Sequence, residues 1–378
     1  MKVALVHDYL NQMGGAERVV LALHEMFPEA PLYTSIYDPL RVDIAFQSID
    51  IRTSFMQKFP LVKKHHQPFL LFYPFAMEQF DLRGYDLVLS SSSAFAKGII
   101  TRPETMHICY CHTPMRWCWN YHEYVEREHL GRIPRSILPL FISALRVWDQ
   151  TSSMRVDHFI ANSPVVADRI RKYYRRDAVV IPPPVEVSRF TFNPTTRPED
   201  YFLIISRLMP YKRIDLAIEA CNQLQLSLVI IGSGRDENRL KRIAGPSIRF
   251  MGRLSDQKVL YYYAHCRALI LPGEEDFGIT PLEAQASGRP VIAYAAGGAL
   301  ASVIDNVTGT FFHKQTVESL MEVLASFDEQ RYDPQTIYNH ALEFDQPRFR
   351  RRIQQFIAAK MSEGKTRDVR TPSSELIR

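Results

Sequence analysis

Short apolar runs alternate with segments of helical periodicity along most of the chain. The first run, residues 3–6, is followed by Gly14 and Gly15. Apolar residues then recur at helical spacing, at Val19, Val20, Leu23 and Phe27. An unbroken apolar run is typical of a buried parallel strand. The pattern therefore predicts a strand, a glycine turn and a helix at the start of the chain.

The same order recurs through the first half of the chain. Apolar runs at 85–93, 107–114, 156–163 and 177–184 are predicted strands, and 164–174 has the periodicity of a helix. Strands that alternate with helices are typical of an α/β fold with a parallel sheet. We therefore predict a doubly wound α/β domain here.

A proline-rich segment, residues 181–200, separates this series from a second one, because prolines at this density stop both helices and strands. The second series also alternates. Its predicted strands are 201–206, 226–232, 247–252, 267–272 and 290–294, and its predicted helices are 213–224, 256–266 and 281–286. The chain thus repeats its architecture without repeating its sequence.

The 378 residues are enough for two domains of ordinary size. We predict a first Rossmann-like domain over 1–185, a linker over 186–200 and a second Rossmann-like domain over 201–345. Residues 346–378 are predicted to form a basic amphipathic helix and a polar tail. Ligands of open α/β sheets bind at the carboxyl ends of strands. Two facing domains would therefore place the glycine turns and charged residues that follow these strands around one cleft.

Composition narrows the class of protein. The chain is 46% hydrophobic and 23% charged, which is ordinary for a globular protein. Its net charge of +5 suits an anionic ligand or membrane surface, but is too small to indicate nucleic acid. No apolar run reaches membrane-spanning length, and the N-terminal run is too short for a signal peptide. An odd number of cysteines, five, favours a reducing compartment, so we expect a cytoplasmic location.

One stretch, "EEDFGITPLEA" at 274–284, combines four carboxylates, three of them before the Phe-Gly turn, with a predicted helix start. Thr280 as N-cap, Pro281 at the first helical position and Glu283 three residues after the cap would form a capping box. Gly288 suits the end of this helix. On this interpretation Glu283 is only part of a helix cap.

The capping box does not account for Glu275, which lies in the turn before the helix. Gly278 permits a tight backbone approach in that turn. The backbone amides of Phe277, Gly278 and Ile279 can point at an anion, as amides at a helix start do. The turn is therefore a candidate anion site.

This stretch resembles the E-x7-E signature of retaining glycosyltransferases of the GT4 family, whose fold is GT-B. Glu275 and Glu283 match the two glutamates. "SRLMPYKRID", with Arg207 and Lys212, resembles the family's basic segment, and "CYCHTPMRW" resembles the segment with its active-site histidine, here His112. "GGAERV" and "GRPVIAYAAGG" resemble its two glycine turns. The resemblance covers roughly residues 1–345.

The motifs look closest to the bacterial and archaeal mannosyltransferase-like branch, which builds O-antigens, exopolysaccharides and lipid-linked glycans. The resemblance implies two Rossmann-like domains facing across a cleft. It also implies transfer of a hexose, with GDP-mannose as the expected donor, to a glycan or polyprenyl-diphosphate-linked acceptor. A UDP-sugar donor stays open, because specificity for base and sugar depends on pocket shape.

The resemblance also implies roles for the charged residues. Arg207 and Lys212 would neutralise the charge that grows on the leaving diphosphate, Arg through bidentate contacts and Lys as a point charge. They would replace a metal, so we expect no metal and no other cofactor. Gly14 and Gly15 open a helix whose N-terminus can also face phosphates. The plainer alternatives are solvated surface cations and a simple tight turn.

The remaining implied roles concern the sugar and the nucleoside. Glu275 would lie near the hydroxyls of the donor sugar and Glu283 near those of the ribose, while Arg253 lies where relatives hold the base. In the front-face mechanism of this family the leaving phosphate assists removal of the acceptor proton. His112 would then hydrogen-bond the donor sugar rather than act as a strong base; a purely structural histidine is the alternative.

The cysteines and histidines at 107–118 have C-x-C spacing and no second pair, so we predict buried free thiols rather than a metal site. Two basic and aromatic segments, 52–80 and 171–176, are candidate contacts with an anionic membrane surface. For 52–80 the alternative is a pair of core helices with a solvated basic face. In this fold the last helix, here with Phe349 and Ile353 on its apolar face, usually crosses back to the first domain.

Two other classes of protein stay open. One is a different GT-B enzyme, a sugar-nucleotide epimerase or a phosphorylase, although no lysine stands out as a pyridoxal site. The other is an inactive GT-B protein that binds a membrane surface. Against an inactive protein, the site residues expected of an active enzyme are present in this sequence.

Overall fold

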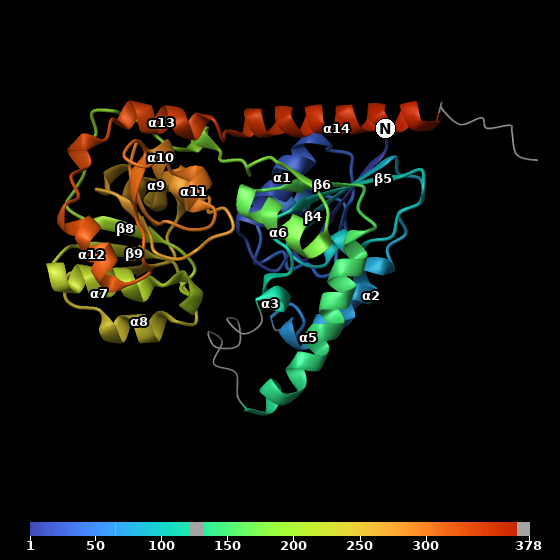
Figure 1. Cartoon of the computed structure of the whole chain (residues 1–378), viewed down its shortest axis with the longest axis horizontal. Helices are drawn as coiled ribbons and strands as arrows, with labels where there is room; N and C mark the ends of the chain where they lie inside the picture. Colours follow the sequence, from blue (N-terminus) through green and yellow to red (C-terminus); the bar gives the residue numbers. More distant parts are fainter. Residues whose placement is uncertain (65, 121–131, 369–378) are drawn as a thin grey trace, which may run out of the picture.

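The computed structural model describes residues 1–64, 66–120 and 132–368 and shows two domains side by side (Figure 1). Within this part of the chain there is one seven-stranded and one six-stranded sheet, and the strand pairings of both are parallel. The prediction of two Rossmann-like domains is therefore confirmed.

The first sheet has the order β3-β2-β1-β4-β5-β6-β7. Its strands are β1 Val3–His7, β2 Leu32–Thr34, β3 Ile51–Thr53, β4 Leu87–Ser92, β5 Met106–Cys111, β6 His158–Ala161 and β7 Ala178–Val180. The chain progresses in opposite directions from β1 and β4, so this pair forms the topological switch point where doubly wound sheets bind ligands. His7, at the end of β1, is paired in register with Ser91 of β4.

The helices of the first domain are α1 Gly15–Met26, α2 Tyr73–Glu78, α3 Arg116–Trp119, α5 Arg132–Ser153 and α6 Pro164–Tyr174. The interpretation of 52–80 as a pair of core helices is wrong. That segment holds the end of β3, two short 3₁₀ helices, Phe55–Lys58 and Gln67–Phe72, and the short α2. Pro60, Pro68 and Pro74 recur too often for a long helix to form.

The second sheet has the order β10-β9-β8-β11-β12-β13. Its strands are β8 Phe202–Ile205, β9 Leu228–Ile231, β10 Ile248–Gly252, β11 Leu269–Leu271, β12 Val291–Tyr294 and β13 Gly309–Phe312. Its helices are α7 Ile214–Leu224, α8 Glu237–Ile243, α9 Asp256–His265, α10 Thr280–Ala286, α11 Ala299–Ser302, α12 Val317–Ala325 and α13 Pro334–Leu342. The switch point here is β8 beside β11, and Arg207 and Glu275 follow these two strands.

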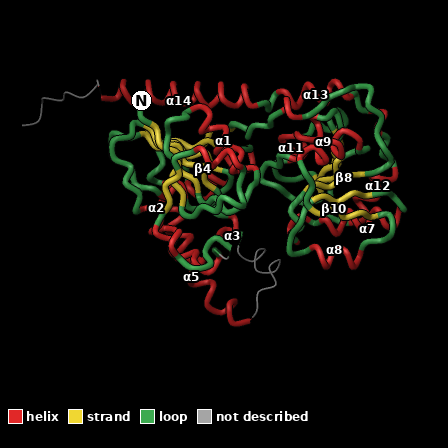
Figure 2. Tube along the Cα trace, turned by 180° about the vertical axis from the view of Figure 1, so that it is seen from behind, coloured by secondary structure: helices red, strands yellow, loops and turns green. Residues whose placement is uncertain are grey.

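A long last helix, α14 Gln346–Asp368, runs from the second domain along the first (Figures 1 and 2). Phe349, Ile353 and Ile357 are buried in the same apolar cluster as residues of α1 and β1. Arg350 of α14 forms an ion pair with Glu25 of α1. The first domain's core is therefore completed by the end of the described chain.

The two tyrosines of the basic, aromatic segment 171–176 face the first domain. Tyr174 is buried and donates a hydrogen bond to Asp149 at 2.9 Å, and Tyr173 stacks on Trp119 with ring centroids 4.4 Å apart. Both rings therefore pack against the domain, and the membrane contact of this segment stays a prediction. None of the described helices is long and apolar enough to cross a membrane.

The cysteines lie in the interior. Cys109 and Cys111 share one face of β5, as strand alternation predicts, and both are buried free thiols. Across residues 1–64, 66–120 and 132–368, no three histidine, cysteine or acidic side chains are grouped to hold a metal ion.

Candidate active site

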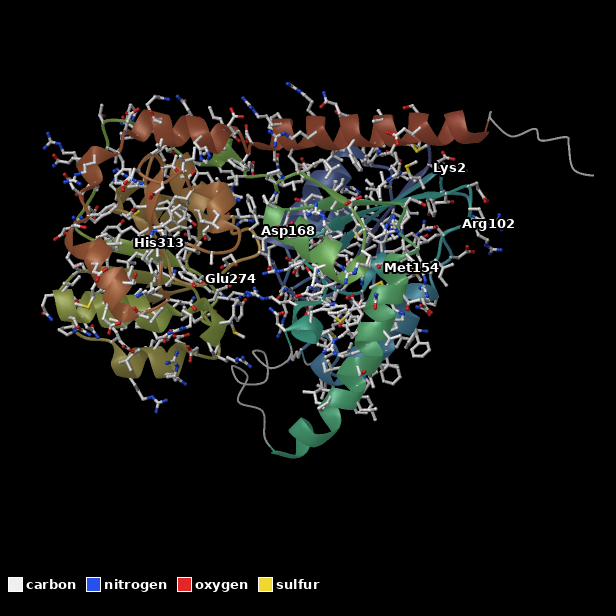
Figure 3. All side chains as sticks on the ribbon, viewed as in Figure 1. Lys2, Arg102, Met154, Asp168, Glu274 and His313 are labelled. Atoms are coloured by element: carbon white, nitrogen blue, oxygen red, sulfur yellow. The ribbon has the colours of Figure 1, made fainter. Side chains whose placement is uncertain are left out.

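The start of α1 in the first domain lies against the start of α10 in the second. A side chain on Gly15 would begin 2.8 Å from the Ile279 side chain, so the glycine permits this approach. Gln12, just before α1, accepts a hydrogen bond from Arg207 at 3.1 Å. Figure 3 shows Asp168 and Glu274 near the same boundary between the domains. The two switch points therefore meet at one junction.

Two cations follow β8 at this junction. The Arg207 guanidinium donates to Gln12 and, at 3.0 Å, to the Tyr211 hydroxyl. Burial acts to lower the pKa of Arg207, but Tyr211 and Glu275 act in the other direction, and its pKa is raised. Lys212 forms an ion pair with Glu275. The structure thus brings together Arg207, Lys212 and Glu275.

The loop that carries Glu275 rests on the glycine turn after β12. The amide of Gly298 donates to the carbonyl of Glu275 at 2.8 Å. A Cβ on Gly298 would lie 2.1 Å from Phe277 Cα, and one on Gly297 would lie 2.3 Å from the Glu275 carbonyl oxygen. Gly278 has φ +83, which favours glycine. This close packing fixes the height of the Glu275 loop above the sheet.

Glu283 does not cap its helix, so the capping-box prediction is wrong. The residue at the N-cap position of α10 is Ile279, and no side chain of the described residues caps this helix. The Glu283 carboxylate instead forms an ion pair with Arg18 of α1 and accepts a hydrogen bond from Tyr263 at 2.6 Å. A cationic partner holds a carboxylate more strongly than a neutral amide does.

The other two carboxylates of the stretch connect the domains. Asp276 forms ion pairs with Arg169 of α6 and, at 3.5 Å, with Arg116 of α3. Arg169 also contacts Glu274 at 3.2 Å, and Ser163 donates to the Asp276 carbonyl at 2.6 Å. We call these five residues the interdomain clasp. Sequence reasoning missed it, although the third carboxylate of the stretch was a signal.

His112 follows β5 at the switch point of the first domain. Its Nε2 lies 2.8 Å from the Ser91 hydroxyl, and its carbonyl accepts a hydrogen bond from Asn162 at 2.9 Å. Burial, with a smaller effect of nearby His7, lowers the pKa of His112 to about 3. The imidazole is therefore neutral at physiological pH.

The remaining predicted residues are more dispersed. Gly14 is the N-cap of α1, and Phe277 has its ring buried beside the Glu275 loop. Ile279 faces Gly15, and no hydrogen bond within the described chain engages the amides of 277–279. Arg253 follows the edge strand β10 and donates to Ser233 at 2.9 Å.

Comparison with known families accounts for this arrangement. The family model described as "Glycosyltransferase Family 4" matches residues 13–189, and the one described as "Glycosyl transferases group 1" matches residues 189–343. The chain belongs to glycosyltransferase family 4. The two matched family models meet at residue 189, where the chain passes from the first domain to the second.

Individual relatives of this family 4 chain vary in how much they share with it. It is 36% identical over 135 residues to the GDP-mannose-dependent monoacylated alpha-(1-6)-phosphatidylinositol monomannoside mannosyltransferase of Corynebacterium glutamicum, covering 32% of this chain and 35% of the relative. It is 24% identical over 350 residues to the alpha-1,3/1,6-mannosyltransferase ALG2 of Mus musculus, covering 79% and 80%. Several curated relatives are matched over only 35% to 50% of their own length.

Among solved structures, Anabaena HepE in complex with UDP has a similar fold. The TM-score is 0.70 at 16% identity, and the match covers 95% of this family 4 chain and 100% of HepE. At this identity the likeness establishes the GT-B fold but does not indicate which nucleotide this chain binds.

Proposed function

We propose that this chain is a retaining glycosyltransferase that moves mannose from GDP-mannose to a glycan or lipid-linked glycan acceptor. The observation that carries the proposal is the junction itself. Arg207, Lys212, Glu275 and Glu283 from the second domain meet the glycine-opened N-terminus of α1 from the first. The GDP-mannose-dependent relative supports the choice of donor.

The two cations are suited to the leaving diphosphate. Charge develops on the β-phosphate as the glycosidic bond breaks, and fixed cations stabilise that charge without reorganisation. Arg207 is held by Gln12 and Tyr211, so its fork is already oriented. Lys212 would exchange its contact with Glu275 for a phosphate oxygen, which frees Glu275 for a sugar hydroxyl. We propose that these cations act in place of a metal, and full turnover in excess EDTA would support that.

His112 is poorly suited to general-base catalysis. A base is effective when its pKa lies near the working pH, and the pKa of about 3 lies far below it. A neutral imidazole can instead donate or accept a hydrogen bond. This supports the front-face mechanism, in which the leaving phosphate takes the acceptor proton and the anomeric configuration is retained.

One face of the first domain is a proposed contact with the membrane that would hold a lipid-linked acceptor. Apolar side chains are exposed on α2 and α5 and the turn before α2: Leu71, Phe72, Phe75, Leu140 and Phe141. A hydrogen bond of 2.9 Å between Trp148 of α5 and Glu78 of α2 ties these elements together. Exposed aromatic and leucine side chains can insert into a bilayer interface.

Sedimentation with anionic phospholipid vesicles tests this surface. We expect the protein to bind vesicles and the variants Phe75→Asp and Phe141→Asp to bind less. Leu300→Asp, at an exposed apolar residue of the second domain, is the control that should bind normally. Absence of vesicle binding by the wild type would refute the membrane contact and would leave the proposed glycosyl transfer untested by this experiment and unchanged.

Calorimetric titration with GDP, UDP, ADP and TDP in EDTA tests the donor. We expect selective GDP binding that weakens at least about tenfold in Arg207→Ala, because a hydrogen bond to a charged group contributes about 1.5–3 kcal/mol. Glu283→Ala should also weaken it. Arg242→Ala, at an exposed cation of α8, is the matched control.

Other results would redirect the proposal. Selective UDP binding would keep the fold and replace mannose with a UDP-sugar. Release of free sugar or an epimer without acceptor would then indicate the epimerase. A folded protein that binds no nucleotide would refute catalysis and favour an inactive GT-B protein.

A further inference from the structure

Four buried side chains form a continuous polar chain behind the site. Glu17 of α1 lies 3.7 Å from His7 Nε2 at the end of β1. His7 Nδ1 lies 3.0 Å from the Ser91 carbonyl oxygen and 3.2 Å from the Ser91 hydroxyl on β4. That hydroxyl lies 2.8 Å from His112 Nε2. The chain crosses the switch point of the first sheet and ends at the junction.

The partners of His7 determine its protonation. The Ser91 carbonyl can only accept, so His7 Nδ1 needs a proton, and the Glu17 carboxylate 3.7 Å from Nε2 favours a proton there as well. Burial acts to lower the pKa of His7, but Glu17, Asp8 and the Ser91 carbonyl outweigh it, and the pKa is raised. The geometry and the raised pKa therefore favour an imidazolium at His7, because its charge and that of Glu17 would compensate each other in the interior.

The proton on His7 in turn orients the Ser91 hydroxyl. A hydroxyl has one hydrogen to donate, and its oxygen faces the N–H of His7. Its hydrogen is therefore directed to its other neighbour, His112 Nε2. As an acceptor, Nε2 carries no proton, so the neutral His112 carries its proton on Nδ1.

Thr113, next to His112, accepts a hydrogen bond from Arg169 of the interdomain clasp at 3.3 Å, which places His112 beside the junction. His112 Nδ1 makes no hydrogen bond within the described residues, yet it is not among the buried polar atoms that lack a partner, as His107 Nδ1 is. It is thus open to a ligand. The charge of Glu17 also acts to raise the pKa of Arg207, one of the two cations proposed to bind the diphosphate.

We infer that Glu17, His7 and Ser91 are positioning residues that fix His112 as its Nδ1–H tautomer and present that N–H to an oxygen of the bound sugar. The inference rests on the proposed function for its ligand, a hexosyl group on a nucleoside diphosphate. It assigns His112 a hydrogen-bond donor role. The three positioning residues act only through it.

Nitrogen NMR of ¹⁵N-histidine-labelled protein, without ligand, tests the tautomer directly. At pH 7 we expect His112 to show a protonated Nδ1 and an unprotonated Nε2. At pH 6 His7 should show two protonated nitrogens, and Glu17→Gln should remove that signature. An Nε2–H tautomer of His112 in the wild type would overturn the inference. Because no donor is added, this result is independent of the proposed function.

Turnover of the nucleotide sugar tests the consequence. Ser91→Ala should lower kcat roughly tenfold, the effect of about one lost hydrogen bond, and leave the affinity for free GDP unchanged because GDP lacks the sugar. In a His112→Ala background Ser91→Ala should have no further effect. Unchanged kcat in Ser91→Ala, or equal losses in both backgrounds, would overturn the inference.

The chain offers a matched control one residue away. Ser90 makes the same 2.8 Å contact to a buried histidine, His107 Nε2, on the other face of β4. Ser90→Ala should therefore leave kcat and the His112 tautomer unchanged. If the wild type turns over no nucleotide sugar, the proposed function fails, while the NMR result still decides whether the positioning chain exists.

Discussion

Gly298 packs directly against the backbone of the Glu275 loop, so alanine there is a small change that should disable the site. Gly298 has φ −70, which alanine adopts without strain. The added Cβ would lie 2.1 Å from Phe277 Cα, whereas ordinary van der Waals contact begins at 3.4 Å. The Glu275 loop must therefore move by about 1.3 Å, as the difference between these distances requires.

Such a displacement separates Glu275 from Lys212 and strains the interdomain clasp. A misplacement of about 1 Å can cost about 100-fold in rate, or about 2.7 kcal/mol of activation free energy. Overpacking should also lower the free energy of unfolding by about 1–3 kcal/mol. We expect Gly298→Ala to fold and bind the donor nucleotide but to lose about 100-fold in kcat. Initial-rate kinetics and urea unfolding measure the two effects.

Gly84→Ala is the control for an added methyl group. Gly84 has φ +81 and nothing within 4 Å of the Cβ position, so alanine costs only about 1–2 kcal/mol of backbone strain there. Its kcat should be that of the wild type. Wild-type kcat in Gly298→Ala would refute the reasoning, since the loop would then tolerate the shift.

Three further predictions concern the clasp and the buried charges. Arg169→Ala should lower kcat about tenfold and enlarge the donor-free protein in small-angle scattering, because it removes the contacts with the Glu275 loop. Lys97→Met should lower the free energy of unfolding in urea by about 3–5 kcal/mol, because it leaves Asp149 buried without its cation. Stability should fall by about 1.4 kcal/mol per pH unit below pH 6.5 through His107, whose pKa burial lowers to about 4, because only the unfolded chain then takes up the proton.

Each of these has a control. Arg171→Ala, on the same helix α6, removes only ion pairs with Asp168 and Asp177, and it should leave kcat and scattering unchanged. A Lys97→Met/Asp149→Leu double variant should regain much of the lost stability, and its failure to do so would contradict the charge argument. His107→Gln should reduce the slope of the stability profile between pH 6.5 and 4 by about 1.4 kcal/mol per pH unit, while His112, whose pKa is lowered to about 3, keeps its own contribution; an unchanged slope would show that His107 titrates normally.

Much of the fold could be predicted from sequence because its signals are local. Unbroken apolar runs mark buried parallel strands, and the helix predicted over 164–174 is α6 to the residue. The short strands β2 and β3 were missed because neither is an unbroken apolar run: their sequences are LYT and IRT. The segment 52–80 was wrongly interpreted as a pair of helices because the interpretation rested on its basic and aromatic composition and not on the spacing of its prolines.

The site was predictable as a set of residue types but not as a network. Glu283 satisfies the local pattern of a cap, yet its partners come from 265 and 20 residues away in sequence. The chain from Glu17 to His112 depends on which strands are neighbours and on their register, which single-sequence patterns do not specify. Ion pairs between residues far apart in the sequence produce no periodic pattern of residue types.

The path of α14 has a consequence for folding during translation. Phe349, Ile353 and Ile357 fill the first domain's core, but they are synthesised after the entire second domain. The first domain is therefore synthesised first but completed last, and the apolar core residues that α14 covers stay uncovered while residues 186–345 are synthesised. We expect a chain released before residue 346 to need a chaperone, however well its second domain folds.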